Sequence, residues 1–461
     1  MQNPLRNLPS VNQLLESPHL KRLTESLNHQ VVVDGVRDFL GALRNRVSEK
    51  LEDVEIPAAA DLAERIAGWL KMQRLSQLRK VINGTGILLH TGLGRAPLSD
   101  AAVHAIQDIA SGYCSVELDL ATGQRGQRAQ LVRQQLIDLT GCESAAIANN
   151  NAAATMLALS SVATGKEVIV SRGQLVEIGG SYRLPEVMSC SGCIMREIGT
   201  TNKTRLADYE QAIHENTGAI LRVHPSNYQV VGFTETPDIR ELVGLGHRKN
   251  IPVIDDIGSG ALIDFSKYGL SDEPMARDSI ECGADLVLFS GDKLVGGPQC
   301  GIIIGRNKFV RQVLANPLMR AMRVGKLTLA ALSATLAQYL RPEQAEQEIP
   351  LLAMLATPLE NLELRAKRVA GQISGIGAVA NAEAVQENSM LGGGSVPGQL
   401  IPGWCISITP AGRTVDQLAS ELRNGTPAIL GRIKQDRLLI DVRTVHPSQD
   451  VALVNVFESL A

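Results

Sequence analysis

The segment that most constrains the architecture of this chain is Leu286-Val-Leu-Phe-Ser-Gly-Asp-Lys-Leu-Val-Gly-Gly-Pro-Gln-Cys-Gly301. An apolar run of strand length places Ser290 and Lys293 at its end, and a glycine-rich turn leads to a second apolar run, Gly301–Gly305. A lysine that forms a Schiff base must be partly desolvated and held still, which this position allows. The flanking glycines let the backbone approach a phosphate, and Ser290 offers it a hydroxyl. The alternative is an ordinary surface lysine in a turn.

Short apolar runs alternate with helical spacing on both sides of this segment. The predicted strands are Ala145–Ala148, Glu167–Val170, Ile194–Ile198, Ala219–Val223, Pro252–Asp255, Leu286–Phe289 and Gly301–Gly305. Residues 238–250, between two of these runs, have the spacing of a helix. This alternation predicts a mostly parallel sheet that helices cover on both faces.

Two adjacent carboxylates, Asp255 and Asp256, end the apolar run Ile251–Ile254. A carboxylate at this place can pair with the protonated pyridine nitrogen of pyridoxal phosphate (PLP) and keep the ring an electron sink. Because successive strand residues face opposite ways, only one of the two should do this. We favour Asp256 and leave Asp255 open. The alternative is an acidic pair that opens a turn.

Polar residues follow two further predicted strands. Asn149–Thr155, which includes Asn151 and Ala152, opens a helix whose free backbone amides could bind a phosphate, although Asn is also a common N-cap. Asn227, in the turn after Ala219–Val223, could donate to the phenolic oxygen of the cofactor, or be an ordinary turn residue. The order of a phosphate loop, an Asn turn, an Asp turn and then a lysine, each at a strand's end, predicts one site at that edge of the sheet.

Composition sets the broad class of the protein. The 461 residues suggest two or three domains, and 44% hydrophobic with 20% charged residues is typical of a globular protein. A formal net charge of −3 gives no overall sign of nucleic-acid binding. Without a signal peptide or an apolar run of membrane length, we expect a cytoplasmic protein with free thiols and no membrane association. Cys190 and Cys193 have redox or metal spacing but lack a second pair, so no metal is predicted.

Changes in the residue pattern along the sequence indicate where one domain ends and the next begins. Apolar positions Leu40, Leu43, Val47 and Leu51 recur at helical spacing, and the basic residues Lys71, Arg74, Arg79 and Lys80 follow. A second, smaller α+β unit near the C-terminus is expected to contain a strand at Arg437–Val442 and a loop with Gly392–Gly394 and Pro397–Gly398. The predicted divisions are a helical domain at 1–70, a linker at 71–84, a catalytic core at 85–325, and a helical linker with the small α+β domain at 326–461.

This order of motifs resembles fold type I PLP enzymes, and three segments narrow the resemblance. Asn83–Pro97, Ser171–Ser181 and Asp256–Gly260 are similar to bacterial selenocysteine synthase, the L-seryl-tRNA(Sec) selenium transferase family, and the similarity covers the whole chain. It implies an α/β, aminotransferase-like fold with a mostly parallel sheet, an N-terminal helical domain that docks the tRNA and a small C-terminal α+β domain. It also implies homo-oligomers, decamers built from dimers, with active sites at subunit interfaces.

The resemblance implies conversion of L-seryl-tRNA(Sec) to L-selenocysteinyl-tRNA(Sec) by PLP-dependent β-elimination to a dehydroalanyl aldimine and addition of selenium from selenophosphate. Lys293 and Asp292 would be catalytic, although Asp292 could equally cap its own loop. The cofactor-binding residues would be Lys293, Asp256, Asp255, Asn151, Ala152, Asn227, Ser290 and Gln174. The selenophosphate-binding residues would be Arg95, Arg128, Arg320 and Arg323, of which the last two, three apart, would share a helical face.

Two other functions fit parts of the pattern. A small-molecule PLP lyase, such as an amino-sugar-acid ammonia-lyase, would use the same lysine, aspartate and phosphate loop but would not need a helical tRNA-docking extension. A non-catalytic RNA-binding protein would not need a Schiff-base lysine. Absorbance from a lysine-bound cofactor excludes the second alternative, and saturable binding of one tRNA excludes the first.

Overall fold

The structure is a computed structural model that describes residues 8–49, 57–74, 78–179 and 182–460. The chain forms two compact units, Met1–Lys80 and Val81–Ala461, which are described separately. Among the described residues, no helix is long and apolar enough to cross a membrane.

The described residues of the N-terminal unit form four helices, α1 (Val11–Leu15), α2 (Pro18–Ser26), α3 (His29–Glu49) and α4 (Ala59–Arg74). The first two begin at serine N-caps, Ser10 and Ser17, whose hydroxyls accept backbone N–H groups. The buried apolar residues of this unit come from all four helices: Leu14, Leu20, Leu23, Val32, Val36, Leu40, Leu62, Ala63, Ile66, Ala67 and Leu70. Leu43 packs against this core, whereas Leu51 and the side chains of Val47, Lys71 and Arg74 lie outside the described residues.

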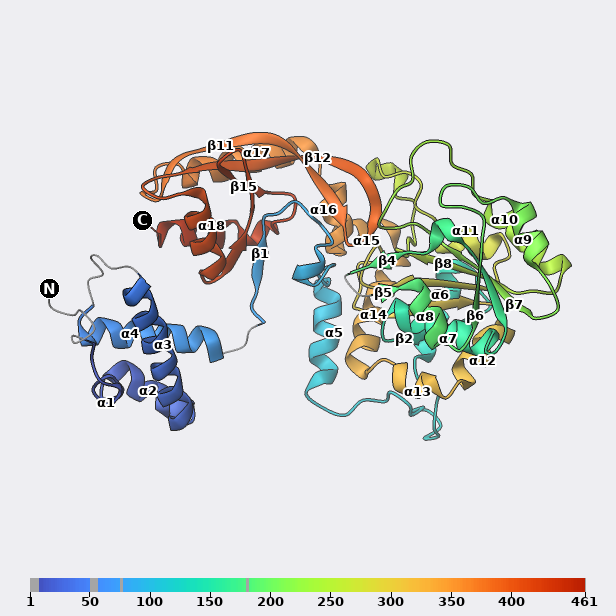
Figure 1. The fold of residues 1–461 in the computed structure, drawn as a ribbon, viewed down its shortest axis with the longest axis horizontal. Coiled ribbons are helices and arrows are strands. Elements are labelled where there is room, and N and C mark those ends of the chain that lie inside the picture. The colour runs from blue at the N-terminus through green and yellow to red at the C-terminus, as the bar shows by residue number, and fades with distance from the viewer. Residues whose placement is uncertain (1–7, 50–56, 75–77, 180–181, 461) are drawn as a thin grey trace. The chain divides into compact units, whose positions relative to one another are not determined.

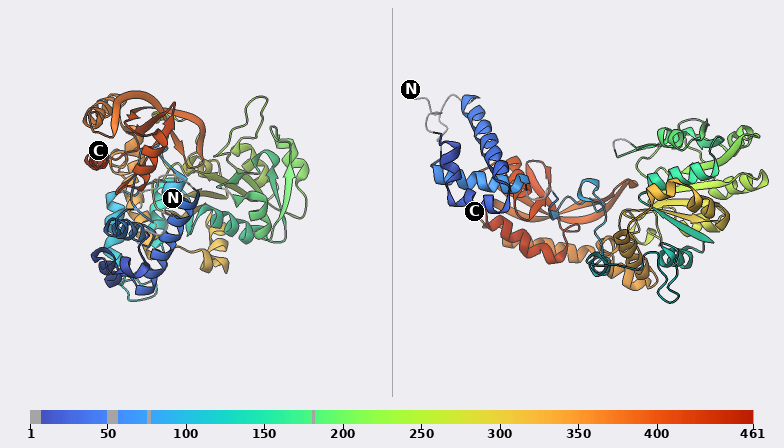
Figure 2. Two further views of the ribbon diagram at one scale, coloured as in Figure 1. Left: turned by 60° about the vertical axis from the view of Figure 1, so that its left-hand side comes forward. Right: turned by 90° about the horizontal axis from the view of Figure 1, so that it is seen from below.

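The larger unit is built around a seven-stranded sheet (Figures 1 and 2), which confirms the predicted fold class. In spatial order its strands are β2 (Ser144–Ala148), β10 (Gly301–Gly305), β9 (Leu286–Ser290), β8 (Val253–Gly258), β7 (Thr217–Val223), β3 (Glu167–Ser171) and β6 (Ile194–Ile198). Only β10 runs antiparallel to its neighbours. All seven predicted strands are therefore present, with ends that differ by at most three residues.

Helices cover both faces of this sheet because its strands are buried on both sides. On β9, Val287 and Phe289 belong to one apolar core and Leu286 and Leu288 to another. The first core includes residues of α6 (Gln130–Thr140), α9 (Leu206–Ala212), α10 (Ile239–Arg248), α11 (Ala276–Glu281), α14 (Lys326–Tyr339), α15 (Pro342–Glu348) and α16 (Pro350–Ala356). The second includes residues of α7 (Asn151–Val162), α8 (Leu184–Cys190) and α12 (Asn307–Ala315). Further elements of this region are α5 (Asp100–Ala110), α13 (Leu318–Met322), β4 (Glu177–Ile178) and β5 (Tyr182–Arg183).

A second, antiparallel sheet lies in the C-terminal part of the same unit. Its strands, in spatial order, are β11 (Val379–Gly392), β12 (Ser395–Pro410), β15 (Arg437–Asp441) and β14 (Arg432–Lys434). The helices α17 (Leu359–Ile373), α18 (Val415–Asn424) and α19 (Asp450–Glu458) supply apolar residues to its core. β15 was predicted correctly, but Pro397 and Gly398 lie within β12 and not in a loop. A proline and a glycine are tolerated here because β11 pairs with β12 only at Ser395 and from Leu400 onward. Pro397 and Gly398 therefore have no paired residue on β11.

The C-terminal part of this unit also binds the chain segment at residues 81–87, which leads toward the large sheet. β1 (Val81–Asn83) pairs in parallel with β13 (Ala428–Leu430), and Ile87 forms a parallel bridge with Met390. Gly86 fits here because a side chain at this position would meet Asp441 at 2.3 Å and because its φ is +77°.

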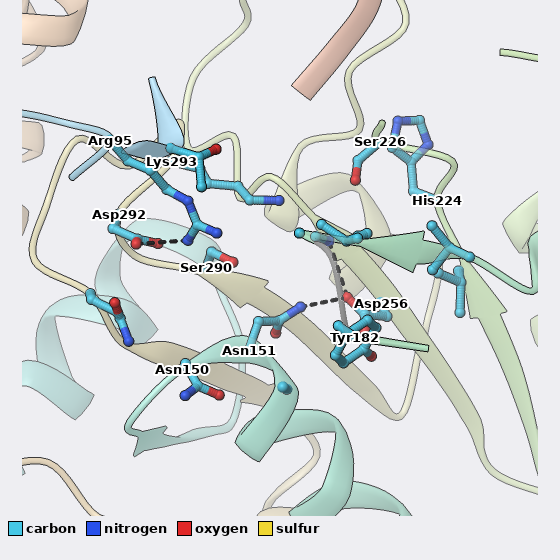
Figure 3. A pocket seen from close by; sticks show the side chains of 18 of the residues that line it. Arg95, Asn150, Asn151, Tyr182, His224, Ser226, Asp256, Ser290, Asp292 and Lys293 are labelled. Carbon is cyan, nitrogen blue, oxygen red and sulfur yellow. Dashed lines mark hydrogen bonds and ion pairs between the residues drawn. The ribbon is translucent and has the colours of Figure 1, made fainter. Parts of the chain in front are cut away.

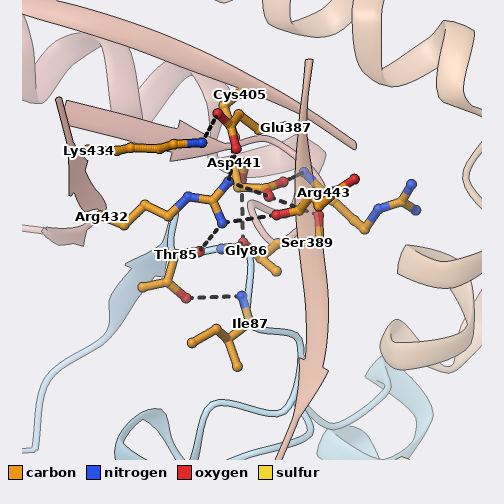
Figure 4. A network of polar contacts seen from close by, with 12 residues as sticks. Thr85, Gly86, Ile87, Glu387, Ser389, Cys405, Arg432, Lys434, Asp441 and Arg443 are labelled. Atoms are coloured by element: carbon orange, nitrogen blue, oxygen red, sulfur yellow. Dashed lines mark hydrogen bonds and ion pairs between the residues drawn. The ribbon is translucent and has the colours of Figure 1, made fainter. Parts of the chain in front are cut away.

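A buried polar network around Asp441 fixes this contact (Figure 4). The fully buried Asp441 carboxylate accepts hydrogen bonds from Ser389 Oγ at 2.8 Å and the Arg443 backbone N–H at 3.0 Å. Thr444 Oγ1 in turn accepts the backbone N–H of Gly86 at 3.1 Å. Burial raises the pKa of Asp441, while Ser389 and Arg443 act in the opposite direction. The loop that follows Gly86 is therefore held by the far end of the chain.

Candidate active site

Lys293 lies just beyond the carboxyl end of β9, in the loop that connects it to the antiparallel β10. The backbone N–H of Gly291 bonds the Cys300 carbonyl at 2.9 Å, so both ends of this loop are tied together. Lys293 is only 4% exposed. Burial is the main cause that lowers its pKa, with Arg95 in the same direction and Asp256, Asp292 and Glu273 opposing. A lowered pKa increases the neutral fraction of this amine at a given pH, and the neutral amine is the form that accepts a proton.

Asp256 lies on the floor of the same site, at the end of β8 (Figure 3). Its Oδ1 accepts hydrogen bonds from Asn151 Nδ2 at 2.9 Å and from the Gly258 backbone at 3.1 Å. Its Oδ2 lies 3.0 Å from the Thr155 hydroxyl. Burial raises the pKa of Asp256 and these hydrogen bonds oppose the rise. The carboxylate is thus held firmly beneath the lysine.

These side chains line a cavity of about 400 Å³. Its lining residues are Thr91, Gly94, Arg95, Asn150, Asn151, Ala152, Val176, Ile178, Gly179, Tyr182, Val223, His224, Ser226, Asp256, Gly258, Ser290, Asp292, Lys293 and Gln299. Asn150 caps α7 by accepting the Ala153 N–H at 2.8 Å, so the N-terminus of this helix lies at the cavity wall.

Asp292 and Arg95 form an ion pair inside the cavity, with Arg95 Nη1 2.8 Å from Asp292 Oδ2. Asp292 is 5% exposed, and its backbone carbonyl accepts the N–H of Ala96. Arg95 has a φ of +62°, an uncommon backbone conformation for a residue other than glycine. Such strain is kept where the surroundings impose it, often at functional sites.

The other three predicted anion-binding arginines do not line the cavity. Arg128 and Arg323 both bind Glu117, at 2.8 and 3.3 Å, and Glu117 also pairs with Arg125. Arg320 is exposed. The prediction that Arg320 and Arg323 share a helical face is wrong, because α13 ends at Met322. Arg323 is extended and forms an antiparallel bridge with Ala148, at the end of β2.

Three predicted cofactor-binding residues also lie outside this cavity. Asp255 is fully buried on the other side of β8, where it accepts from Arg222 Nη1 at 2.8 Å and from Ser279 Oγ at 2.7 Å. Asn227 donates to the Glu177 carbonyl at 2.9 Å. Gln174 accepts the Val223 backbone N–H at 3.1 Å and lines a neighbouring cavity. Asn151, Ala152, Ser290, Asp256 and Lys293 are brought together as expected.

Sequence reasoning did not single out several lining residues. Tyr182 stands alone in its segment, His224 and Ser226 share the turn after β7, and Gln299 lies in the loop that carries Lys293. A local signal existed for the last three, since His224 and Ser226 follow a predicted strand and Gln299 lies in the same glycine-rich segment as Lys293. Burial, followed by the nearby Arg222, lowers the pKa of His224 to about 4, so this imidazole is neutral at pH 7.

The tip of the β11–β12 hairpin closes one side of the lysine site. Lys293 Nζ lies 3.4 Å from the Gly394 carbonyl, and Gly392, Gly393 and Gly394 all have positive φ. The tip is held by Glu273, whose Oε1 accepts the Val396 N–H at 2.8 Å and whose Oε2 accepts the Ser259 hydroxyl. Sequence reasoning treated this segment as a plain loop and did not consider Glu273.

The polar groups that line the cavity have the chemistry needed to bind PLP. A buried lysine, a buried carboxylate and the N-terminus of α7 surround one cavity, and Asn151 Oδ1 is buried without a hydrogen-bond partner. Lys293 would hold the aldehyde carbon, Asp256 the pyridine nitrogen, and Ser290 with the Asn151–Ala152 backbone the phosphate.

Cys190 and Cys193 lie apart from this site. Cys190 is exposed, whereas Cys193 is buried and donates from Sγ to the Met188 carbonyl at 3.1 Å. Burial raises the pKa of Cys193 to about 11. Among residues 8–49, 57–74, 78–179 and 182–460, no group of three or more His, Cys, Asp or Glu side chains could hold a metal ion.

Comparison with known proteins decides the family. The family profile described as L-seryl-tRNA selenium transferase matches residues 81–446, which include the whole cavity. The chain belongs to the L-seryl-tRNA selenium transferase family. A second profile of this family, described as selenocysteine synthase N terminal, matches residues 5–44.

Relatives of the selenium transferase family match almost the full length. The L-seryl-tRNA(Sec) selenium transferase of Carboxydothermus hydrogenoformans is 45% identical over 96% of this chain and 94% of its own. That of Moorella thermoacetica is 46% identical over 97% of this chain and 95% of its own. Among solved structures, D-glucosaminate-6-phosphate ammonia-lyase matches with a TM-score of 0.58 and 21% identity, covering 84% of this chain and 97% of its own. This last likeness shows the shared fold alone.

Proposed function

We propose that this chain converts L-seryl-tRNA(Sec) to L-selenocysteinyl-tRNA(Sec), with PLP as cofactor and selenophosphate as selenium donor. One observation carries the proposal: the buried Lys293 and Asp256 share a cavity within a chain that is 45% identical, over 96% of its length, to a relative of that name.

When bound, PLP supplies an electron sink that makes the seryl Cα–H acidic and lets the β-hydroxyl leave. Lys293, with its pKa lowered by burial, is suited to take the Cα proton and to return it after selenium has been added. The Gly394 carbonyl, 3.4 Å from Nζ, can accept a hydrogen bond from the ammonium that forms meanwhile. Asp256 supplies the fixed negative charge that favours a protonated pyridine nitrogen.

Asp292 and Arg95 are suited to the departure of the hydroxyl and the arrival of the donor. Asp292 lies in the cavity with the lysine, and its carboxylate can take up a proton and pass it to the leaving oxygen, or steer the donor. Arg95 offers its guanidinium to the anionic donor from the same wall. Arg128, Arg320 and Arg323 would extend this anion site, with Glu117 holding two of the three in place.

The tRNA would dock on the N-terminal helical unit, which is a separate compact unit and carries a family match of its own at residues 5–44. We further propose the domain limits 1–70, 71–84, 85–325 and 326–461, a cytoplasmic location and a homo-oligomer, a decamer by analogy with the family. Asp255, Asn227 and Gln174 would support the cofactor site from outside the cavity.

A small-molecule PLP lyase is the second candidate, because the fold is shared with D-glucosaminate-6-phosphate ammonia-lyase. The family match at residues 5–44 favours the tRNA substrate.

The test is an assay of purified PLP-loaded protein with selenophosphate and one of three substrates: seryl-tRNA(Sec), seryl-tRNA(Ser) or D-glucosaminate 6-phosphate. We expect selenocysteinyl-tRNA from the first substrate alone. Release of ammonia from the sugar acid, without any product on tRNA, would establish the lyase instead.

A further inference from the structure

A second cavity, of about 330 Å³, adjoins the catalytic cavity. Val223 and His224, at the end of β7, belong to the linings of both. Glu273 and Val396, which hold the hairpin tip beside Lys293, line the second cavity as well. The two spaces are therefore neighbours that share His224 and the hairpin tip as their boundary, and the catalytic roles described above leave the second one without a function.

The lining of the second cavity is rich in neutral hydrogen-bonding groups. It includes Ser171, Thr200, Thr201, Asn202, Thr234 and Gln399. Its two cations, Lys203 and Arg222, are outnumbered by the three carboxylates of Glu235, Asp272 and Glu273, and Arg222 is further paired with Asp255 at 2.8 Å. A phosphate-binding cavity would carry an excess of positive charge. The lining therefore suits an uncharged group with several hydroxyl and amine functions and not a phosphate.

Aromatic and apolar side chains accompany these polar groups. Tyr228 lines the cavity, and its hydroxyl donates to the Gly173 carbonyl, which holds its ring in place. Phe233, directly before the lining residue Thr234, is 87% exposed. Fixed and exposed aromatic rings of this kind are the common means by which proteins stack unpaired bases.

The covalent structure of the proposed substrate requires such a space. In an aminoacyl-tRNA the seryl carbonyl is esterified to the ribose of the 3′-terminal adenosine. When the seryl Cα reaches Lys293, this nucleoside must lie immediately beside the catalytic cavity. At that boundary the His224 side chain is 15% exposed and neutral at pH 7, so it adds no charge where the ester would pass.

We infer that the second cavity binds the 3′-terminal adenosine of the aminoacyl-tRNA, with the base among the neutral polar groups and Tyr228, and the ribose toward His224. This inference rests on the proposed function and adds a substrate subsite to it. If adenosine binds there, changes in the second cavity should alter KM for the tRNA and leave cofactor binding unchanged.

Photocrosslinking of the holoenzyme tests the location directly. tRNA(Sec) that carries 8-azidoadenosine at its 3′ end is bound, irradiated and digested, and the labelled peptides are identified. We expect label on segments 200–204, 228–236 or 396–399. Label elsewhere, or no label on tRNA that filter binding shows to be retained, overturns the adenosine site and leaves the proposed function standing. Failure of the tRNA to bind at all overturns both.

A matched pair of substitutions provides a second readout. Thr201→Trp fills the cavity from an exposed position, whereas Thr164→Trp places the same bulk at an exposed threonine that lines neither cavity. We expect Thr201→Trp to raise KM for seryl-tRNA(Sec) roughly tenfold or more and to reduce crosslinking, with unchanged cofactor absorbance. Thr164→Trp should behave as wild type. Thr236→Trp, on another segment of the lining, repeats the test if Thr201→Trp does not fold. Unchanged KM and crosslinking in a folded cavity variant overturn the inference.

Discussion

At the scale of single residues, Asp255 and Asp256 show how one strand serves two purposes. Both carboxylates are buried at the end of β8, but Asp256 faces Asn151 and the catalytic cavity, whereas Asp255 faces Arg222 and Ser279. Each has its own set of hydrogen bonds, which offsets the cost of burying a charge. The arrangement leaves one carboxylate available to a cofactor and uses the other to join β7, β8 and α11.

Replacing Lys293 by Ala should remove the absorbance of the lysine-bound cofactor and abolish turnover, because no other lysine of the described part of the chain lines the cavity. Binding of tRNA should stay nearly intact, since docking is assigned to the N-terminal unit. Borohydride reduction of the wild type followed by peptide mapping should place the cofactor on Lys293. A label on a different lysine would contradict the assignment.

His224 gives a prediction on pH and stability. Its pKa is lowered from 6.5 to about 4 by burial, so between these values the unfolded chain binds a proton that the folded chain does not. Stability should therefore fall as pH decreases through this window, by up to about 1.4 kcal/mol per pH unit from this group. His224→Gln should show a shallower loss in urea unfolding at pH 7, 6 and 5. Parallel curves for the two proteins would argue against a neutral buried His224.

The residues that sequence reasoning could place were those in compact motifs at strand ends. Lys293, Ser290, Asn151 and Ala152 lie in the cavity because the carboxyl ends of the parallel strands, and the loops that follow them, meet at one edge. Strand alternation correctly required Asp255 and Asp256 to face apart. Tyr182 could not be found, because no local pattern links its segment to the others and only the folded chain brings them together. Gln299 lies in the same segment as Lys293, but the chemistry of its side chain did not mark it as a site residue.

At the scale of elements, the β11–β12 hairpin links the two sheets. Its tip contacts Lys293 through Gly394, and Glu273 holds it through the N–H of Val396. The tip can approach so closely because its three glycines adopt positive φ and carry no side chains. Its position should therefore affect both the lysine and the proposed nucleoside cavity.

Gly393→Ala tests this close approach. A side chain here would lie 2.8 Å from Leu89 Cβ and 2.9 Å from the Leu89 carbonyl, in addition to the strain of a φ of +66°. Gly412→Ala is the control, with the same φ of +66° and open space around it. We expect about 1–2 kcal/mol of lost stability for the control and a further 1–3 kcal/mol for Gly393→Ala, together with weaker cofactor retention. Equal urea midpoints and equal cofactor absorbance for both variants would show that the tip can move freely.

The network around Asp441 gives a second prediction at this scale. Asp441→Ala leaves the Ser389 hydroxyl and the Arg443 backbone N–H without their buried acceptor, and we expect a loss of about 1–3 kcal/mol for each of these donors. Glu383→Ala, which removes an exposed partner of Arg437 in the same sheet, should cost at most about 1 kcal/mol. Denaturant unfolding of the two variants compares them. Similar small losses would mean that Asp441 does not anchor the loop at Gly86.

Local sequence patterns predicted the strands of the large sheet well, but they predicted two other segments wrongly. Every predicted strand of the large sheet exists, because buried apolar runs with polar ends leave few alternatives. Arg323 was wrongly placed on a helix because its pairing with Ala148 is a tertiary contact, and such contacts override local spacing. Pro397 and Gly398 were also placed wrongly, because their residue types favour a loop, whereas the folded chain includes them in β12.

At the scale of the whole molecule, the two compact units allow the proposed tRNA docking to be tested apart from the chemistry. Deleting residues 1–70 should leave a folded protein that keeps its cofactor absorbance, because every residue that lines the catalytic cavity belongs to the larger unit. Its affinity for tRNA(Sec) should fall at least about tenfold in filter binding. If the shortened protein keeps full affinity, the docking surface lies elsewhere. Binding of tRNA(Ser) to the wild-type chain is the control for nonspecific binding.

The long-range pairing of the segment before Arg95 has a consequence for how the protein is made. Gly86 bonds Thr444, 358 residues later, and β1 pairs with β13. At usual rates of synthesis these partners leave the ribosome roughly 20–70 s after Gly86 does. The apolar core of the N-terminal helices is made of residues from Leu14 to Leu70, so it can form during that time. The loop that follows Gly86 must wait for nearly the entire polypeptide, so a nascent chain would form its N-terminal helices well before it has a site in which to hold a cofactor.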